Sequence, residues 1–280
     1  MLQAQGFRIA AALSLLSYAH PRTQREKLEK IEGFQDFAFL DSRLNASLGH
    51  QAPDTGTQVS VVSTREALWV AARGTPLERS REPETDLQWQ DLRNDLSAWP
   101  TSNYAGTALV ASGFKRAADG IWEQLMPHLA QAMAEHKAIH LTGHSLGAAV
   151  ATHLGERMHH ELNSLPDTLT TLGSPDVGWR GQQQHLRQLG LEGRTVRFVN
   201  HIDPVPGSVP LGKPLGTTVY INSQGLLETG ARHFSDRLKG VGQALLQLNL
   251  NPLQDHYPMR YYEAIKDPRN AQALEQLGQP

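Results

Sequence analysis

The sequence contains no cysteine and almost no surplus of charge of either sign. Its 280 residues include 26 Lys and Arg and 28 Asp and Glu, for a formal net charge of -2. The lack of cysteine excludes disulfide bonds, thiolate nucleophiles and cysteine-ligated metals. Proteins that bind nucleic acids need surplus basic side chains to neutralise phosphates, so the balanced charge argues against a nucleic acid as partner.

Long hydrophobic runs are also missing, and none approaches the ~20 apolar residues that a transmembrane helix requires. The apolar stretch at residues 7–18 is short, contains Arg8 and lacks a clear small-x-small cleavage site. Its large and small apolar residues share one helical face: Phe7, Ala10, Ala11, Leu15 and Tyr18. We therefore interpret it as the first helix of the mature fold and find no clear signal peptide.

No low-complexity linker and no internal repeat divides the chain. A hydrophobic fraction of 39% over 280 residues is enough for one large core. We expect one domain over residues 1–280, with an N-terminal helix at 7–30, a core at about 58–265 and a polar tail at 267–280.

Short β-like segments alternate with helical patterns, the order expected of a mainly parallel sheet covered by helices. The candidate strands are residues 58–63, 67–72, 138–142, 168–172, 195–199 and 217–221. Only three residues separate the first two strands, so these should pair as a hairpin. Apolar residues at spacings of three and four predict amphipathic helices over 113–133 and 234–248. The pattern predicts an α/β fold in which helices flank a mainly parallel central sheet.

A Gly-x-Ser-x-Gly motif, formed by Gly143, Ser145 and Gly147, lies between an apolar strand and a helix. A serine that attacks a carbonyl must stand at the end of the sheet, and a sharp strand-to-helix turn places it there. Glycines two residues before and after the serine relieve the backbone crowding of such a turn. The motif predicts the nucleophile elbow of an α/β-hydrolase fold, with Ser145 as nucleophile and His144 inside the turn. A plain glycine-rich turn is the alternative.

A serine hydroxyl needs a histidine as base and a carboxylate that orients this histidine. In α/β-hydrolases the carboxylate follows the nucleophile and precedes the histidine in the chain. Asp203 fits best, because it comes just after the strand 195–199 in a loop that two prolines stiffen. Asp176 is the alternative, although its position directly after Pro175 is more typical of a turn residue.

Several histidines follow the nucleophile, and spacing alone does not identify the base. Those on the next helix, or before the aspartate, do not fit the expected order: His153, His159, His160 and His201. His233 and His256 stay as candidates. His256 begins a loop that leads into a terminal helix, which is the better position for a base.

Several segments, in order, resemble one known family. They are Ser-Gly-Phe-Lys-Arg-Ala at 112–117, Gly-His-Ser-Leu-Gly-Ala-Ala at 143–149, Thr-Leu-Gly-Ser-Pro-Asp-Val-Gly at 171–178, Val-Asn-His-Ile-Asp-Pro-Val-Pro at 199–206 and Asp-His-Tyr-Pro-Met-Arg-Tyr-Tyr at 255–262. They are similar to class 3 lipases, a family that includes fungal triacylglycerol lipases, feruloyl esterases and plant phospholipases A1. The resemblance spans roughly residues 59–265. It implies Asp203 as the triad aspartate and favours His256 over His233 as the base.

Ala-Arg-Gly-Thr at 72–75 resembles the oxyanion segment of the same family. The resemblance implies that the backbone N–H groups of Thr75 and Leu146 stabilise the oxyanion. Losing one such donor typically lowers turnover by ~10²–10³. A plain turn after a strand is the alternative. The resemblance also suggests that Asp91 or Asp95 holds this loop in place.

The stretch at 76–89 departs from the family, because charges dominate where many family lipases have an apolar lid helix. Burying the unpaired charges of this stretch at an oil surface costs more free energy than burying its three apolar side chains gains. We expect an open site or a cover from the apolar stripe at 234–248 with Leu250 and Leu253, although such a stripe is more often part of the core.

The expected substrate is a lipid or acyl ester, with contact to a lipid–water interface. Triacylglycerols, phospholipid acyl esters and smaller or feruloyl-type esters all stay open as substrates. The expected chemistry uses no metal and no organic cofactor. A non-catalytic α/β-hydrolase scaffold that binds a ligand is the alternative from another functional class.

Overall fold

The computed structural model of the chain describes residues 2–75, 99–229 and 252–278. The charged stretch at 76–89, which stands where many family lipases have a lid helix, and the apolar stripe at 234–248 lie outside these residues, as does His233. In the part that is described, no helix is long and apolar enough to cross a lipid bilayer.

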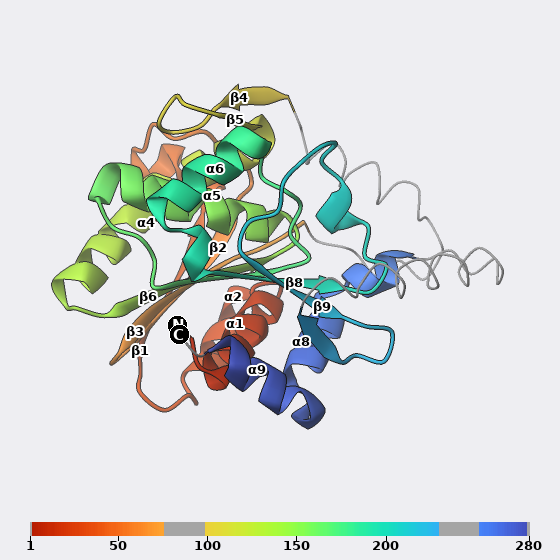
Figure 1. The fold of residues 1–280 in the computed structure, drawn as a ribbon. Helices are drawn as coiled ribbons and strands as arrows, with labels where there is room; N and C mark the ends of the chain where they lie inside the picture. The colour runs from red at the N-terminus through yellow and green to blue at the C-terminus, as the bar shows by residue number, and fades with distance from the viewer. Residues whose placement is uncertain (1, 76–98, 230–251, 279–280) are drawn as a thin grey trace, which may run out of the picture.

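A mixed sheet forms the centre of the described structure (Figure 1). Its eight described strands, in spatial order, are β1 (Phe34–Asp41), β2 (Gln58–Thr64), β3 (Ala67–Ala72), β6 (Ala138–His144), β7 (Thr168–Leu172), β8 (Thr195–Asn200), β9 (Thr217–Ile221) and β10 (Leu227–Thr229). The strands from β3 to β9 pair in parallel, whereas β1, β2 and β3 pair antiparallel, as do β9 and β10. The predicted hairpin and the mainly parallel sheet are confirmed.

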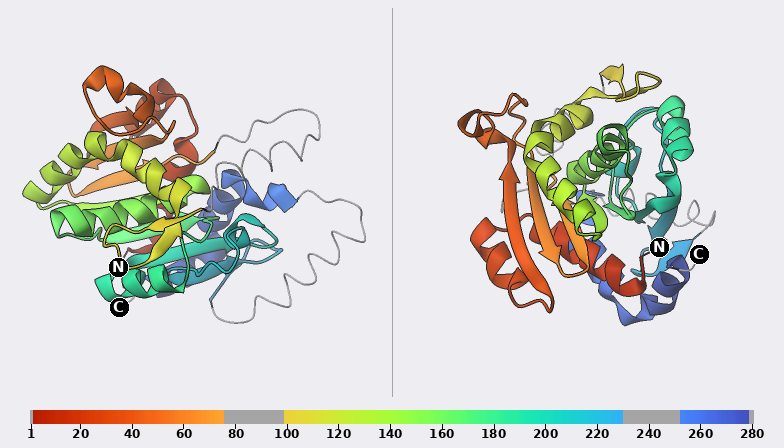
Figure 2. Two further views of the ribbon diagram at one scale, coloured as in Figure 1. Left: turned by 90° about the horizontal axis from the view of Figure 1, so that it is seen from above. Right: turned by 90° about the vertical axis from the view of Figure 1, so that its left-hand side faces the viewer.

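Helices cover both faces of the sheet (Figures 1 and 2). One face carries α4 (Ser112–Ala134), α5 (Leu146–Leu162) and α6 (Arg180–Leu189), and the other carries α1 (Ala4–Leu16), α2 (Pro21–Leu28), α8 (Pro258–Lys266) and α9 (Ala271–Leu277). A small hairpin of β4 (Pro100–Ser102) and β5 (Leu109–Ala111) precedes α4. Short 3-10 helices complete the described elements: Ser42–Leu44, Ala46–Leu48, Glu192–Arg194, Val205–Gly207, Pro252–His256 and Pro268–Asn270.

Two apolar layers hold these helices against the sheet. Phe114, Ile121 and Leu125 of α4 are buried in the first layer, on the side of α5. Phe7 of α1 and Tyr261 of α8 are buried in the second, on the opposite face. Because both faces are covered, β7 and β8 are buried along their whole length. The predicted amphipathic helix at 113–133 is confirmed as α4.

The ends of the chain differ from the prediction. The single helix expected at 7–30 is two helices, because Pro21 lacks the N–H that a continuous helix needs and instead begins α2. The expected polar tail at 267–280 contains α9, which buries Leu274 against the second layer. The sheet begins with β1, before the core expected at 58–265. Partial exposure of this edge strand weakens the alternation that would have predicted it.

Topology brings the chemical groups to one edge of the sheet. The parallel strands β6, β7 and β8 all end there, and their following loops carry the predicted nucleophile and both candidate aspartates. Ligands in open α/β sheets bind outside the carboxyl ends of the strands. The candidate site therefore lies at this edge.

Candidate active site

Ser145 lies at the turn between β6 and α5, as the N-cap of the helix. Its φ of 58° and ψ of -130° lie outside the regions that side-chain-bearing residues favour. Its backbone N–H donates to the carbonyl oxygen of Leu172 at the end of β7, at 2.9 Å. This bond attaches the strained turn to the neighbouring strand.

The two glycines of the motif are required by close backbone approaches. A Cβ atom on Gly143 would lie 2.4 Å from the backbone of Gly147, and one on Gly147 would lie 2.1 Å from the carbonyl oxygen of Ala72. Both separations are below the 3.0 Å that real Cβ atoms respect. The helix can therefore start directly behind the serine only with glycine at both positions, which is the geometry of a nucleophile elbow.

The fold brings Ser145 together with His256 and Asp203. His256 Nε2 lies 2.8 Å from Ser145 Oγ, and His256 Nδ1 lies 2.8 Å from Asp203 Oδ2. Asp203 and His256 are fully buried, and Ser145 is 2% exposed. The arrangement offers a base to the serine hydroxyl and an orienting carboxylate to the base.

Two further groups donate to the Asp203 carboxylate. The hydroxyl of Tyr261 donates to Oδ2 at 2.5 Å, and the N–H of Val205 donates to Oδ1 at 2.9 Å. Burial, with the adjacent carboxylate, raises the pKa of Tyr261 well above its ordinary value. The phenol therefore stays protonated and acts as the donor.

The second candidate carboxylate, Asp176, has a cation as its partner. Arg197 Nη2 lies 3.0 Å from Asp176 Oδ1, and both side chains are nearly buried. Burial raises the pKa of Asp176, while the charges of Arg197 and Lys213 lower it. Asp176 therefore forms an ion pair inside the loop after β7, apart from the imidazole of His256.

The remaining histidines of the described region have other surroundings. His201 Nδ1 lies 3.0 Å from Asp255 Oδ2, and His153 is buried within α5, 3.5 Å from Glu156. Across the described ranges, no three His, Asp or Glu side chains group together in a way that could hold a metal ion.

The loop after β3 packs against the elbow. A Cβ on Gly74 would lie 2.5 Å from the carbonyl oxygen of His144 and 3.1 Å from the Cβ of Ser145. Thr75 follows directly, and Leu146 is the first residue of α5, where N–H groups have no acceptor within the helix. The predicted oxyanion residues therefore lie on two segments next to Ser145. Asp91 and Asp95, predicted to hold this loop, lie outside the described residues.

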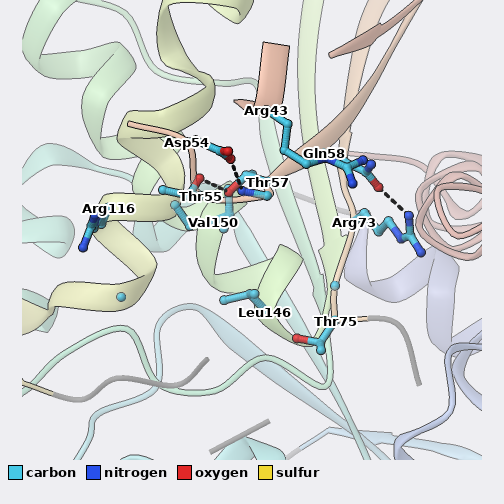
Figure 3. A pocket seen from close by; sticks show the side chains of 14 residues that line it. Arg43, Asp54, Thr55, Thr57, Gln58, Arg73, Thr75, Arg116, Leu146 and Val150 are labelled. Atoms are coloured by element: carbon cyan, nitrogen blue, oxygen red, sulfur yellow. Dashed lines mark hydrogen bonds between the residues drawn. The ribbon is translucent and has the colours of Figure 1, made fainter. Parts of the chain in front are cut away.

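A cavity of about 520 Å³ opens beside the predicted oxyanion residues, and polar side chains dominate its wall (Figure 3). Thr75 and Leu146 border one side of it, and Asp54, Thr55 and Thr57 border the opposite side. Its other lining residues are Arg43, Gly56, Gln58, Arg73, Gly74, Gly113, Arg116, Ala117 and Val150. A substrate that enters here meets hydroxyl, amide and guanidinium groups close to the oxyanion residues.

A second histidine, His144, lies directly behind the catalytic edge. It is fully buried, its Nε2 lies 2.6 Å from the carbonyl oxygen of His256, and its Nδ1 lies 2.8 Å from the hydroxyl of Tyr18. Burial, with repulsion from His256, lowers the pKa of His144 well below its ordinary value. His144 is therefore neutral at physiological pH.

A family model described as lipase (class 3) matches residues 69–212, just over half of the chain. The chain belongs to the class 3 lipase family. The resemblance seen in the sequence motifs is thereby confirmed, and family membership supports lipase or ester hydrolase activity. The match includes Thr75, Ser145 and Asp203 and ends before His256.

Solved structures of fungal lipases share the fold. A Rhizomucor miehei lipase in complex with its propeptide has 20% identity and a TM-score of 0.61, covering 78% of this chain and 68% of that chain. The nonglycosylated Yarrowia lipolytica LIP2 lipase has 19% identity and a TM-score of 0.62, covering 89% of this chain and 91% of that chain. Lipase II from Rhizopus niveus has 20% identity and a TM-score of 0.61, covering 78% of this chain and 80% of that chain. No curated protein sequence matches significantly. The α/β-hydrolase fold is confirmed.

Two tyrosines at the candidate site of this class 3 lipase were not predicted from the sequence. Tyr261 lies within the segment that resembles the family's histidine region, five residues after His256, and no motif marked it as a partner of Asp203. Tyr18 was noted only as part of an apolar helical face. A hydroxyl at the end of such a face signals a buried polar partner, but the sequence does not identify that partner.

Proposed function

We propose that this class 3 lipase hydrolyses carboxylic esters of lipids or other acyl groups, with Ser145 as nucleophile, His256 as base and Asp203 as the carboxylate that orients the base. The observation that carries the proposal is the unbroken chain of hydrogen bonds from Asp203 through His256 to Ser145, with both contacts at 2.8 Å. The strained elbow supports it, because such strain persists mainly at functional sites.

In the proposed reaction, His256 Nε2 takes the proton from Ser145 Oγ as Oγ attacks the ester carbonyl carbon. The carbonyl oxygen becomes an oxyanion that the N–H groups of Thr75 and Leu146 stabilise. When the tetrahedral intermediate collapses, the ester C–O bond breaks and His256 returns its proton to the departing alcohol. A water molecule then loses a proton to His256, attacks the acyl-enzyme and releases the carboxylic acid.

Asp203 stabilises the imidazolium that forms on His256 and keeps the ring in the tautomer whose Nε2 can accept a proton. Hydrogen bonds from Tyr261 and Val205 hold this carboxylate in place. The chain's own groups thus perform every proton transfer in the proposed cycle.

The polar wall of the cavity favours esters with a polar group near the scissile carbonyl. Arg73, Thr55 and Thr57 offer donors to phosphate, glycerol or phenolic oxygens, which an acyl tail lacks. We therefore propose phospholipid acyl esters and short-chain or feruloyl-type esters as candidate substrates beside triacylglycerols. A panel of p-nitrophenyl esters from two to sixteen carbons, tributyrin, emulsified triolein and phosphatidylcholine vesicles separates these classes and measures the dependence on a lipid–water interface.

The first test is Ser145→Ala. We expect a loss of p-nitrophenyl ester hydrolysis of about 10⁶-fold, since residues that act as one catalytic unit lose about this much when the nucleophile is removed. The circular dichroism spectrum should stay unchanged. Full activity in the variant would contradict the proposal.

A fluorophosphonate probe provides the matched chemical test. The wild-type protein should be labelled at Ser145 alone, and Ser145→Ala should not be labelled. A protein that folds normally but takes no label and hydrolyses no ester on the panel would support the alternative of a non-catalytic binding scaffold.

A further inference from the structure

Tyr18, just beyond the end of α1, connects with three segments of the proposed catalytic site. Its hydroxyl lies 2.8 Å from His144 Nδ1 and accepts a hydrogen bond from the backbone N–H of Gly74. His144 in turn reaches the carbonyl oxygen of His256, 2.6 Å from Nε2. One continuous chain of hydrogen bonds therefore joins the oxyanion loop, the nucleophile elbow and the backbone of the base.

The chemistry of the groups determines the direction of each bond. The carbonyl oxygen of His256 can only accept, so His144 Nε2 carries the proton and donates it. A neutral imidazole has only one N–H, so Nδ1 accepts and the Tyr18 O–H donates. Burial raises the pKa of Tyr18, although the charge of Arg73 and the N–H of Gly74 lower it, so the phenol keeps its proton. The chain thus runs in one direction, from Gly74 to His256.

The packing around this hydroxyl is tight. A Cβ on Gly74 would lie 2.2 Å from the Tyr18 oxygen, and the Arg73 guanidinium lies over the Tyr18 ring at 5.7 Å. The rings of His144 and His256 are also adjacent, with centroids 4.6 Å apart. A small shift of Tyr18 would therefore move both the loop that precedes Thr75 and the ring of His144, which lies against His256.

We propose that Tyr18 is a positioning residue, which acts through His144 to set the oxyanion loop and the base His256 relative to Ser145. The inference rests on the proposed function, because it gives Tyr18 a role in that same site. The O–H of Tyr18 donates to Nδ1 of His144, so this nitrogen is not free to accept a proton from Ser145. His256 is therefore the histidine that accepts the serine proton.

Tyr18→Phe tests the inference, because it removes one oxygen and keeps the ring. We expect kcat on a p-nitrophenyl ester to fall about 10- to 100-fold with KM within two-fold, since sub-ångström to ångström misplacement of reacting groups lowers the rate by this order. The rate of labelling by a fluorophosphonate should fall in parallel. A variant in which only KM changes would overturn the inference.

Two controls separate positioning from general destabilisation. Tyr104→Phe removes a partly buried hydroxyl that donates to Asp119 at 2.9 Å, remote from the triad, and Ser14→Ala removes a buried hydroxyl of α1 that bonds Thr142 at 2.8 Å. Both should lower the melting temperature about as much as Tyr18→Phe while kcat stays within two-fold of the wild type. Equal kcat in Tyr18→Phe and Tyr104→Phe would overturn the inference.

The elbow histidine supplies a rescue test. His144→Gln keeps an amide donor and a carbonyl acceptor, whereas His144→Phe keeps neither. We expect His144→Gln to retain a higher kcat than His144→Phe, and the reverse order would contradict the chain of bonds. The Ser145→Ala variant distinguishes a failure of this inference from a failure of the proposed function. If Ser145→Ala is inactive and Tyr18→Phe is fully active, only the role of Tyr18 is refuted. If Ser145→Ala is active, the proposed function itself is refuted.

Discussion

The loops after β7 and β8 each carry a buried aspartate next to a proline, and the two carboxylates have different partners. Asp203 receives hydrogen bonds from neutral or polar donors, Tyr261 and the Val205 N–H, and lies 2.8 Å from the His256 ring. Asp176 lies 3.0 Å from the guanidinium of Arg197. A carboxylate that lies against an imidazole can stabilise the cation that forms transiently on that ring, whereas the Asp176 carboxylate lies against a guanidinium that is always charged.

The Asp176 pair has a structural task that serves the other loop. Arg197 Nη2 also lies 3.0 Å from the carbonyl oxygens of Ser174 and Pro206, in the loops after β7 and β8. One guanidinium thus ties the two loops together. Two aspartates in similar sequence surroundings therefore have different roles, because the fold brings different side chains against them.

The strongest test of the comparison exchanges each carboxylate for its amide. Asp203→Asn should lower kcat about 10⁴-fold, because the amide favours the wrong tautomer of the base and no longer stabilises the imidazolium. Asp176→Asn should keep kcat within a few-fold, because its partner is not part of the proton relay. Steady-state hydrolysis of a p-nitrophenyl ester measures both, with circular dichroism as the control for folding. Similar losses of kcat in the two variants would contradict the different roles assigned to the two carboxylates.

A smaller effect is expected from Tyr261→Phe. The variant removes the 2.5 Å hydrogen bond to Asp203 and leaves the contacts of the carboxylate with His256 and the Val205 N–H in place. A hydrogen bond to a charged group contributes roughly 1.5–3 kcal/mol, so we expect kcat/KM to fall about 10- to 150-fold. The Tyr104→Phe variant is the matched control, and equal rates for the two would show that Tyr261 only fills space.

The smallest effect concerns the pH dependence of stability. Burial raises the pKa of Asp176 above its usual value of 3.8, despite Arg197 and Lys213. The folded state then binds this proton more tightly than the unfolded state, so the stability from this group is complete at low pH and is lost as pH rises through the raised pKa.

Asp176→Asn removes this titration while it keeps the side-chain shape. The free energy of unfolding of the wild type, relative to the variant, should therefore decrease between pH 4.5 and pH 7.5, by at most about 1.4 kcal/mol per pH unit. Urea denaturation at both pH values measures the change. An advantage of the wild type that grows with pH would show that Arg197 dominates and that the carboxylate is held charged.

Most of the sheet was predictable, because its central strands are short apolar segments with helical patterns between them. The six predicted strands and α4 all appear. β1 was missed because it is a partly exposed edge strand, and the break before α2 was missed because the apolar pattern was extended through Pro21. The local sequence pattern therefore predicts a strand or helix best where neighbouring elements bury it on both sides.

For the site, the elbow was the easiest part to predict, since Gly143, Ser145 and Gly147 form a short motif with a fixed spacing, although the contact that requires Gly147 is with Ala72 on another strand. The choice of Asp203 and His256 used loop position and family resemblance, and it stays a proposal for their roles. Tyr18 and Tyr261 could not be predicted, because each bonds a residue far away in the chain: Tyr18 and His144 are 126 positions apart, and Tyr261 and Asp203 are 58 positions apart.

By itself, the sequence determined the alternation of strands and helices, the glycine motif of the turn at the serine and the resemblance to a lipase family, because each is read from short segments of the chain. Only the tertiary structure decided which carboxylate faces an imidazole and which a guanidinium, and which tyrosine lies behind the elbow. Those outcomes depend on distances between atoms that the chain brings together from separate strands and helices, and on the burial that makes each such contact strong.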